Sequence, residues 1–215
     1  MKPLLVLRPE PGNQATVEQA RELGLKPVSC PLFAIEPIDW TTPATSSVDF
    51  ILFTSANALR HGGGQIASLT KLAALAVGPA TADAARAAGF RVAITGDDGV
   101  DALLEALPGA RRLLHLAGAD HRPTATRHAI ETAVVYRSVA LAAQVIPPGK
   151  LVALVHSPRA GARLAELAPE RASMSIAAIS PAAAAACGAG WESVAVANQP
   201  SDRALLALAA RLCQD

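Results

Sequence analysis

The sequence has few of the residues that hold small secreted or metal-bound proteins together. Its 215 residues include three cysteines, Cys30, Cys187 and Cys213, too few and too scattered for a disulfide framework or a zinc knuckle. Aromatic residues make up 3% of the chain, and 19 basic against 18 acidic residues leave a formal net charge of +1. Nucleic-acid-binding proteins usually carry a strong basic excess, so we expect no nucleic-acid partner.

Long apolar runs are also lacking. No run reaches the roughly 18 residues that a membrane span needs. The most apolar stretch, residues 176–191, is interrupted by Pro181, Gly188 and Gly190. The apolar run that follows Lys2 is too short for the core of a signal peptide. We therefore expect a cytoplasmic protein with reduced cysteines and no membrane partner, and a monomer is the default expectation.

The sequence instead alternates short apolar runs with alanine-rich segments. Strands are predicted at residues 4–7, 50–53, 75–77, 92–95 and 113–116. Helices are predicted behind them, at residues 13–23, 55–59, from Pro79 onward, at 100–107 and at 124–132. Residues 28–38 are predicted to be extended, because Pro27, Pro31 and Pro37 oppose a helix there. This alternation indicates parallel sheet built from βαβ units.

An internal repeat extends this interpretation. The segment FILFTS (residues 50–55) aligns with VALVHS (residues 152–157) at an offset of 102. The same offset places Gly78-Pro79 on Ser180-Pro181, and residues 102–104 on residues 204–206. A shared offset across strand, turn and helix predicts a duplicated α/β domain.

The second copy lacks a unit equivalent to residues 113–118, and residues 4–9 resemble that unit. We therefore expect a discontinuous domain of residues 1–36 plus 143–215, with a second domain of residues 37–142 inserted into it. The chain would cross between the domains near residues 33–39 and 134–142. The expected fold class is two similar flavodoxin-like, three-layer α/β domains with parallel sheets, joined by a two-stranded connector beside a cleft.

The common catalytic motifs are missing. The chain has no G-x-G-x-x-G, no Walker loop, no H-E-x-x-H and no G-x-S-x-G. His115, His121 and His128 are spaced by six and seven residues, which does not match a helical metal pair. We expect no metal site, and we expect the cysteines to be small core or interface residues.

What recurs is a strand followed by a small or hydroxyl residue and a helix start. These positions are Thr54-Ser55, Gly78-Pro79 with Thr81, Gly118 with Arg122, Ser157-Pro158 and Ser180-Pro181. Strand ends of parallel sheets are the usual ligand edge, and helix N-termini favour anions. Any one of these residues is more simply a helix cap, but their recurrence around one cleft favours anion binding. Arg8, Arg60, Arg122 and Arg159 follow strand ends or open helices, and we expect two of the four to face ligand.

The order of these segments resembles the uroporphyrinogen-III synthase family. The matching segments are LLVLRP (4–9), FTSANA (53–58), VGPATA (77–82), Gly89, Gly118 with Arg122, Val135-Tyr136, Ser157-Pro158 and AISP (178–181). The resemblance implies a lyase of haem (tetrapyrrole) biosynthesis that needs no metal or organic cofactor. Its substrate would be hydroxymethylbilane, a small molecule with eight carboxylates, which loses water, inverts its last pyrrole ring and closes to uroporphyrinogen III.

The resemblance also implies site residues. Tyr136, the only tyrosine, matches the family's hinge tyrosine and would assist departure of the hydroxyl as water. Substrate would be bound by Arg8, Thr54, Ser55, Gly78, Pro79, Thr81, Gly118, Arg122, Ser157, Pro158, Arg159, Ser180 and Ala182. Three features depart from the family pattern: Ala182-Ala183 where a hydroxyl is usual, a short loop at residues 144–149, and the glycine run at residues 62–64.

Two other functions remain open at this point. The chain would equally suit a catalytically weak or inactive cytoplasmic binder of an anionic tetrapyrrole or another polycarboxylate. A nucleotide-dependent transferase with paired α/β domains lacks its phosphate-binding motif here.

Overall fold

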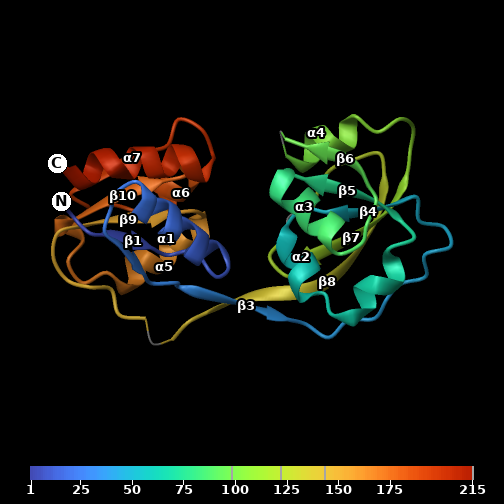
Figure 1. The fold of residues 1–215 in the computed structure, drawn as a ribbon, viewed down its shortest axis with the longest axis horizontal. Coiled ribbons are helices and arrows are strands. Elements are labelled where there is room, and N and C mark those ends of the chain that lie inside the picture. The colour runs from blue at the N-terminus through green and yellow to red at the C-terminus, as the bar shows by residue number, and fades with distance from the viewer. Residues whose placement is uncertain (98, 122, 143, 215) are drawn as a thin grey trace. The chain divides into compact units, whose positions relative to one another are not determined.

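The computed structural model describes residues 1–97, 99–121, 123–142 and 144–214 (Figure 1). The chain divides into two compact units: Met1–Ala34 with Val139–Asp215, and Ile35–Ser138. Each unit is an α/β structure with a largely parallel sheet, and the second unit is inserted into the first. The predicted fold class is therefore confirmed.

The sheet of the discontinuous unit has, in the described part of the chain, five strands in the order β11-β10-β9-β1-β2. They are β11 (Ser193–Val196), β10 (Met174–Ala178), β9 (Leu151–Val155), β1 (Leu4–Val6) and β2 (Pro27–Ser29), and all neighbours pair in parallel. The helices are α1 (Gly12–Glu22), α5 (Pro158–Leu167), α6 (Pro181–Ala186) and α7 (Asp202–Gln214), with a short 3₁₀ turn, η2 (Arg171–Ser173).

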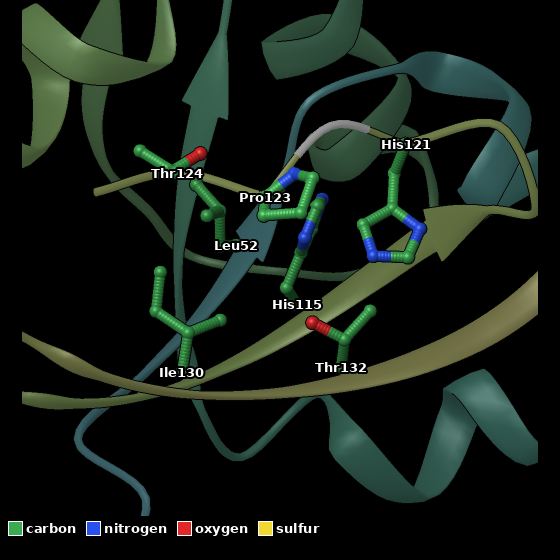
Figure 2. A pocket seen from close by; sticks show the side chains of 7 residues that line it. All are labelled: Leu52, His115, His121, Pro123, Thr124, Ile130 and Thr132. Atoms are coloured by element: carbon green, nitrogen blue, oxygen red, sulfur yellow. The ribbon is translucent and has the colours of Figure 1, made fainter. Parts of the chain in front are cut away.

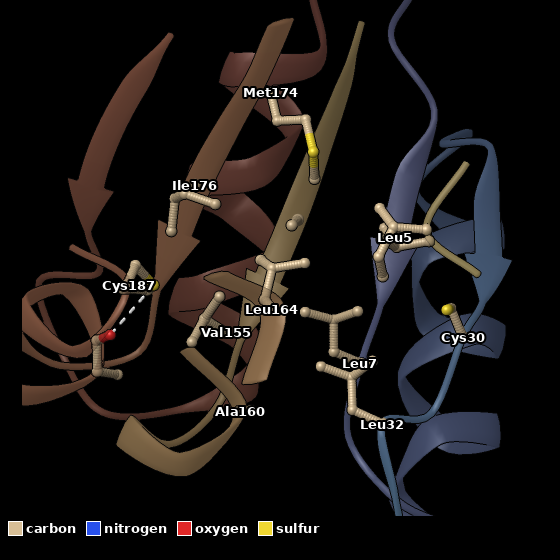
Figure 3. Close-up of a cluster of buried hydrophobic side chains, with 14 of the residues drawn as sticks. Leu5, Leu7, Cys30, Leu32, Val155, Ala160, Leu164, Met174, Ile176 and Cys187 are labelled. Carbon is tan, nitrogen blue, oxygen red and sulfur yellow. Dashed lines mark hydrogen bonds between the residues drawn. The ribbon is translucent and has the colours of Figure 1, made fainter. Parts of the chain in front are cut away.

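Alternate residues of these strands enter two different cores. Leu5 and Val155 pack in one cluster with α5 and α6, whereas Leu4 and Leu154 pack in another with α1 and α7. Figure 3 shows the first cluster, with Cys30 and Cys187 among its members. This two-sided burial explains why the strands read as continuous apolar runs in the sequence.

The sheet of the inserted unit runs β3-β8-β7-β4-β5-β6. Its strands are β3 (Phe33–Pro37), β8 (Ala129–Ala140), β7 (Arg112–Gly118), β4 (Phe50–Phe53), β5 (Ala73–Val77) and β6 (Val92–Gly96). Its helices are α2 (Ala56–His61), η1 (3₁₀, Gly64–Leu69), α3 (Pro79–Ala87) and α4 (Val100–Glu105). β3 and β8 are the two strands along which the chain passes from one unit to the other.

The two sheets share one topology. β9, β10 and β11 follow each other as β4, β5 and β6 do, and β1 takes the place of β7. Leu4 pairs with Val152 as Leu113 pairs with Phe50. The N-terminal strand thus takes the place beside β9 that β7 takes beside β4.

One sequence expectation needs correction. The helix predicted at residues 124–132 is wrong, because Ala129 already begins β8. β-branched residues such as Ile130 and Thr132 favour a strand, and pairing with β7 satisfies the backbone there. The glycine run at residues 62–64 leads into a 3₁₀ turn, since Gly64 opens η1. The cysteines are buried as expected, and no helix among the described residues is long and apolar enough to cross a membrane.

Candidate functional site

A cavity of about 330 Å³ lies at the carboxyl ends of β4 and β7 in the inserted unit. It brings together four residues predicted for the site: Thr54 and Ser55 after β4, Gly118 at the end of β7, and Tyr136 on β8. The other lining residues are Ile35, Asn57, Ala119, Asp120, His121 and Ser138. We call this the tyrosine cavity.

Gly118 and Tyr136 are held together by an irregularity in the sheet. The register of β7 against β8 shifts between Ala117 and Gly118, which pairs Gly118 with Tyr136. The backbone N–H of Ala119 donates to the Tyr136 carbonyl at 2.9 Å. A Cβ added to Gly118 would lie 2.6 Å from Cζ of Tyr136, so the ring occupies space that any side chain at residue 118 would need. The glycine therefore sets the position of the tyrosine ring.

The hydroxyls at the end of β4 have different roles. Ser55 is extended and its Oγ accepts from the backbone N–H of Asn57 at 3.2 Å, so it caps α2. Thr54 Oγ1 lies 3.0 Å from Nε2 of His115. The simpler cap interpretation thus holds for Ser55, whereas Thr54 connects the tyrosine cavity to a buried histidine.

Two histidines were considered in the sequence only as metal ligands, and the structure places both at this end of the sheet. His121 lines the tyrosine cavity. His115 is 7% exposed, and its pKa is lowered to about 4, first by burial and then by His121. A polar residue inside the otherwise apolar strand LLHLAG (113–118) is the signal that could have marked His115. Among the described residues, no group of three or more His, Cys, Asp and Glu could hold a metal ion.

Gly78, Pro79 and Thr81, which were also predicted for the site, do not line this cavity. Gly78 precedes α3 with φ +83°, and Pro79 is the first residue of the helix. Thr81 is only 6% exposed, on the inward face of α3. Arg122 lies outside the described residues.

The remaining predicted residues belong to the discontinuous unit. Ser157 and Ser180 each cap a helix, accepting from the N–H of Ala160 and Ala183 respectively. Pro158 opens α5, and Ala182 lies in the first turn of α6. The guanidinium of Arg159 lies over the Phe33 ring, 4.7 Å from its centroid.

Arg8 lies in a polar network that the sequence did not indicate. Its Nη1 donates to Asp202 Oδ2 at 3.1 Å and to Thr16 Oγ1 at 3.3 Å. Asp202 also accepts from Thr16 at 2.8 Å and from His156 Nε2 at 2.7 Å. Burial alone would raise the pKa of Asp202, but the hydrogen bonds from His156 and Thr16 outweigh it and the pKa is lowered. Asp202 comes from α7, so this network links helix and strand ends that lie far apart in the sequence.

The fold and the cavity define a class: a two-unit α/β protein with parallel sheets, one unit inserted in the other, and a polar cavity at the strand ends. The family model described as uroporphyrinogen-III synthase HemD matches residues 14–207. The chain therefore belongs to the uroporphyrinogen-III synthase family.

Solved structures agree on the fold. The uroporphyrinogen-III synthetase of Helicobacter pylori is similar with a TM-score of 0.70 at 17% identity, covering 99% of this chain and 100% of that one. A mutant uroporphyrinogen III synthase of Thermus thermophilus has a TM-score of 0.58 at 19% identity, covering 100% and 99%. A search of curated proteins found no significant match.

Proposed function

We propose that this chain catalyses the reaction of its family as a lyase that needs no cofactor: hydroxymethylbilane loses water and closes, with inversion of its last pyrrole ring, to uroporphyrinogen III. The observation that carries the proposal is the family match over residues 14–207. Nothing in the match or the fold favours a binder without activity. The proposal includes a monomer that acts in the cytoplasm on this small molecule.

The chemistry needs a proton donor and a fixed geometry. The C–O bond of the hydroxymethyl group breaks, and the hydroxyl leaves as water after taking up a proton. Inversion also requires the C–C bond that joins the last ring to its bridging carbon to break, so two new C–C bonds form, one at each α-carbon of that ring, and the previously free α-carbon loses its proton. We assign the proton donated to the leaving hydroxyl to Tyr136, whose ring Gly118 positions at the tyrosine cavity. General acid catalysis of this kind contributes about 100- to 10,000-fold in rate.

Positioning is the second requirement, because closure without inversion gives the type I isomer. A cavity of about 330 Å³ holds only part of a tetrapyrrole, so we place the reacting end of the substrate there. Thr54, Asn57 and Ser138 offer neutral hydrogen-bonding groups around it. Holding the reacting groups in one geometry supplies several kcal/mol, on the order of 7–11 kcal/mol in the best intramolecular cases.

The isomer assay tests the proposal. Hydroxymethylbilane is incubated with and without the protein, the products are oxidised, and the ratio of type III to type I uroporphyrin is measured. We expect type III to dominate in the presence of the protein and type I in its absence. Type I alone in both samples would reject the synthase, and tight binding of uroporphyrinogen without turnover would favour a binder.

A further inference from the structure

A second, smaller cavity lies in the inserted unit beside the tyrosine cavity. Its volume is about 170 Å³, and Figure 2 shows the side chains that line it. Its polar members are His115, His121, Thr124 and Thr132, and the apolar ones are Leu52, Pro123 and Ile130. We call it the histidine pocket. His121 lines both cavities, so the two are neighbours.

One ring nitrogen of His121 is already used in a hydrogen bond to the backbone. Its Nδ1 lies 3.0 Å from the carbonyl oxygen of Gly118, and a carbonyl only accepts, so Nδ1 carries a hydrogen. Nε2 is therefore the nitrogen left for a ligand. It accepts a hydrogen bond when the ring is neutral and donates one when the ring is protonated.

The rings of His115 and His121 lie close together in an edge-to-face arrangement. Their centroids are 5.8 Å apart with an interplanar angle of 88°. Burial and the neighbouring His121 lower the pKa of His115, so His115 is uncharged at neutral pH. Among the described residues that line the histidine pocket, none is acidic.

His128, by contrast, shows the pattern of a structural histidine. Its Nδ1 accepts from the N–H of Arg111 at 3.1 Å, and its Nε2 lies 2.8 Å from the carbonyl of Leu104. Both nitrogens are thus used by backbone groups. Among the residues that the structure describes, His115 and His121 each have a hydrogen-bond partner for one ring nitrogen only. The pair at the pocket is therefore better placed than His128 to bind a ligand.

We propose that the histidine pocket binds one carboxylate arm of the substrate. The carboxylate lies in the pocket beside the two rings and takes its hydrogen bond from Nε2 of His121. Thr124 and Thr132 offer hydroxyl donors, and Leu52 and Ile130 contact the methylene groups of the arm. With a volume of about 170 Å³, the pocket has room for the carboxylate end of a propionate arm. The proposal rests on the function proposed above and places one arm relative to the reacting end.

Binding is linked to protonation. Because Nδ1 already carries a hydrogen, Nε2 of His121 donates to a carboxylate only when the ring takes up a second proton, so carboxylate binding is expected to weaken as the pH rises. The titratable groups near His121 in the described chain are His115 across the pocket and Asp120 and Tyr136 in the tyrosine cavity. Because His115 resists protonation, a single proton is expected to accompany the ligand.

The test uses sodium propionate as the probe and the full-length protein. Histidine ring signals are followed by NMR during titration with propionate, and with sodium chloride at equal ionic strength. We expect saturable shifts of the His115 and His121 signals with propionate only, weakening as the pH rises, and no shift of the His128 signals. His121→Leu, which removes the donor, should abolish the response of His115, whereas His61→Leu, outside the pocket, should leave it intact.

Two results would overturn the proposal: His115 and His121 signals that respond no more to propionate than to chloride, or unchanged propionate affinity in His121→Leu, which has no hydrogen-bond donor at residue 121. The isomer assay separates this failure from failure of the proposed function. Type III product without a propionate response rejects the histidine pocket alone. A propionate response without type III product rejects the synthase and leaves a pocket for a free carboxylate.

Discussion

The ring of Tyr136 fills the space in which a side chain at Gly118 would begin, with Cζ and Cε2 of the ring 2.6 and 2.7 Å from the position of a Cβ. The contact is with the far end of a side chain rather than with backbone. A substitution at residue 118 is therefore expected to move the tyrosine ring and leave the sheet in place.

Gly118→Ala tests this relationship. We expect turnover to fall about 100-fold, because displacing a reacting group by about 1 Å has effects of this size. The free energy of unfolding, measured by urea denaturation, should change by no more than about 1 kcal/mol. In the Tyr136→Phe background Gly118→Ala should lower turnover little further, because the ring that it displaces no longer carries the hydroxyl that donates the proton.

Gly64→Ala is the matched control. Gly64 is exposed at the start of η1, and no atom lies within 4 Å of a Cβ placed there. Turnover and stability should stay close to those of the parent protein. Equal turnover for Gly118→Ala and Gly64→Ala would contradict the positioning role of Gly118.

His115 predicts a pH dependence of stability. Its pKa of about 4 in the folded chain lies below the ordinary value, so the unfolded chain binds the proton first as the pH falls. Stability is thus highest above about pH 6.5 and declines down to about pH 4, by up to about 3 kcal/mol. His115→Gln should flatten this part of the profile in urea unfolding measured across the pH range.

His61→Gln is the control for that profile. The pKa of His61 is also lowered, by burial and by Arg60, but His61 is less buried than His115. Its removal should change the slope less. A profile of His115→Gln that parallels the parent from pH 6.5 to pH 4 would show that His115 is not the group responsible.

Asp202 predicts a second pH effect, in the acid range. Its pKa is lowered in the folded chain, so its contribution is present above the ordinary carboxyl pKa and is lost as the pH falls through the lowered value. Asp202→Asn should destabilise the protein by about 2 kcal/mol at neutral pH, since it weakens charged hydrogen bonds from Arg8, Thr16 and His156. It should also flatten the acid limb of the profile.

Asp83→Asn serves as its control. Asp83 pairs with Arg86 on the surface of α3, with a side chain that is 75% exposed. Exposed pairs of this kind contribute little. Equal losses in Asp202→Asn and Asp83→Asn would argue against a special role for the Asp202 network.

Much of the fold could be predicted from the sequence, because strands that are buried on both faces appear as short apolar runs between the helical segments. The internal repeat could also be recognised, since one offset aligned strands, turns and helix starts of the two copies. The gap in the second copy then pointed to residues 4–9 as the missing unit. The helix at residues 124–132 was mispredicted, although Ile130 and Thr132 favour a strand, because the pairing of Ala129 onward with β7 could not be read from the local sequence. Long-range pairing of this kind is set by tertiary contacts.

The candidate site could be predicted only in part. The strand-end pattern found Thr54, Ser55 and Gly118, and the resemblance indicated Tyr136; the structure gathers these four around one cavity. The six-residue spacing of His115 and His121 could not show that their rings are in contact. That contact depends on how the chain turns after the end of β7. Nor could it show that Arg8 pairs with Asp202, 194 residues away.

The role of Tyr136 as proton donor is tested most directly by the rate at which Tyr136→Phe forms uroporphyrinogen III at saturating hydroxymethylbilane. The substitution removes one hydroxyl and keeps the ring that packs on Gly118. We predict a loss of at least about 100-fold with an unchanged unfolding midpoint, and product that shifts toward the spontaneous type I isomer. Type III formation at the parental rate would contradict the assignment of Tyr136 as the proton donor.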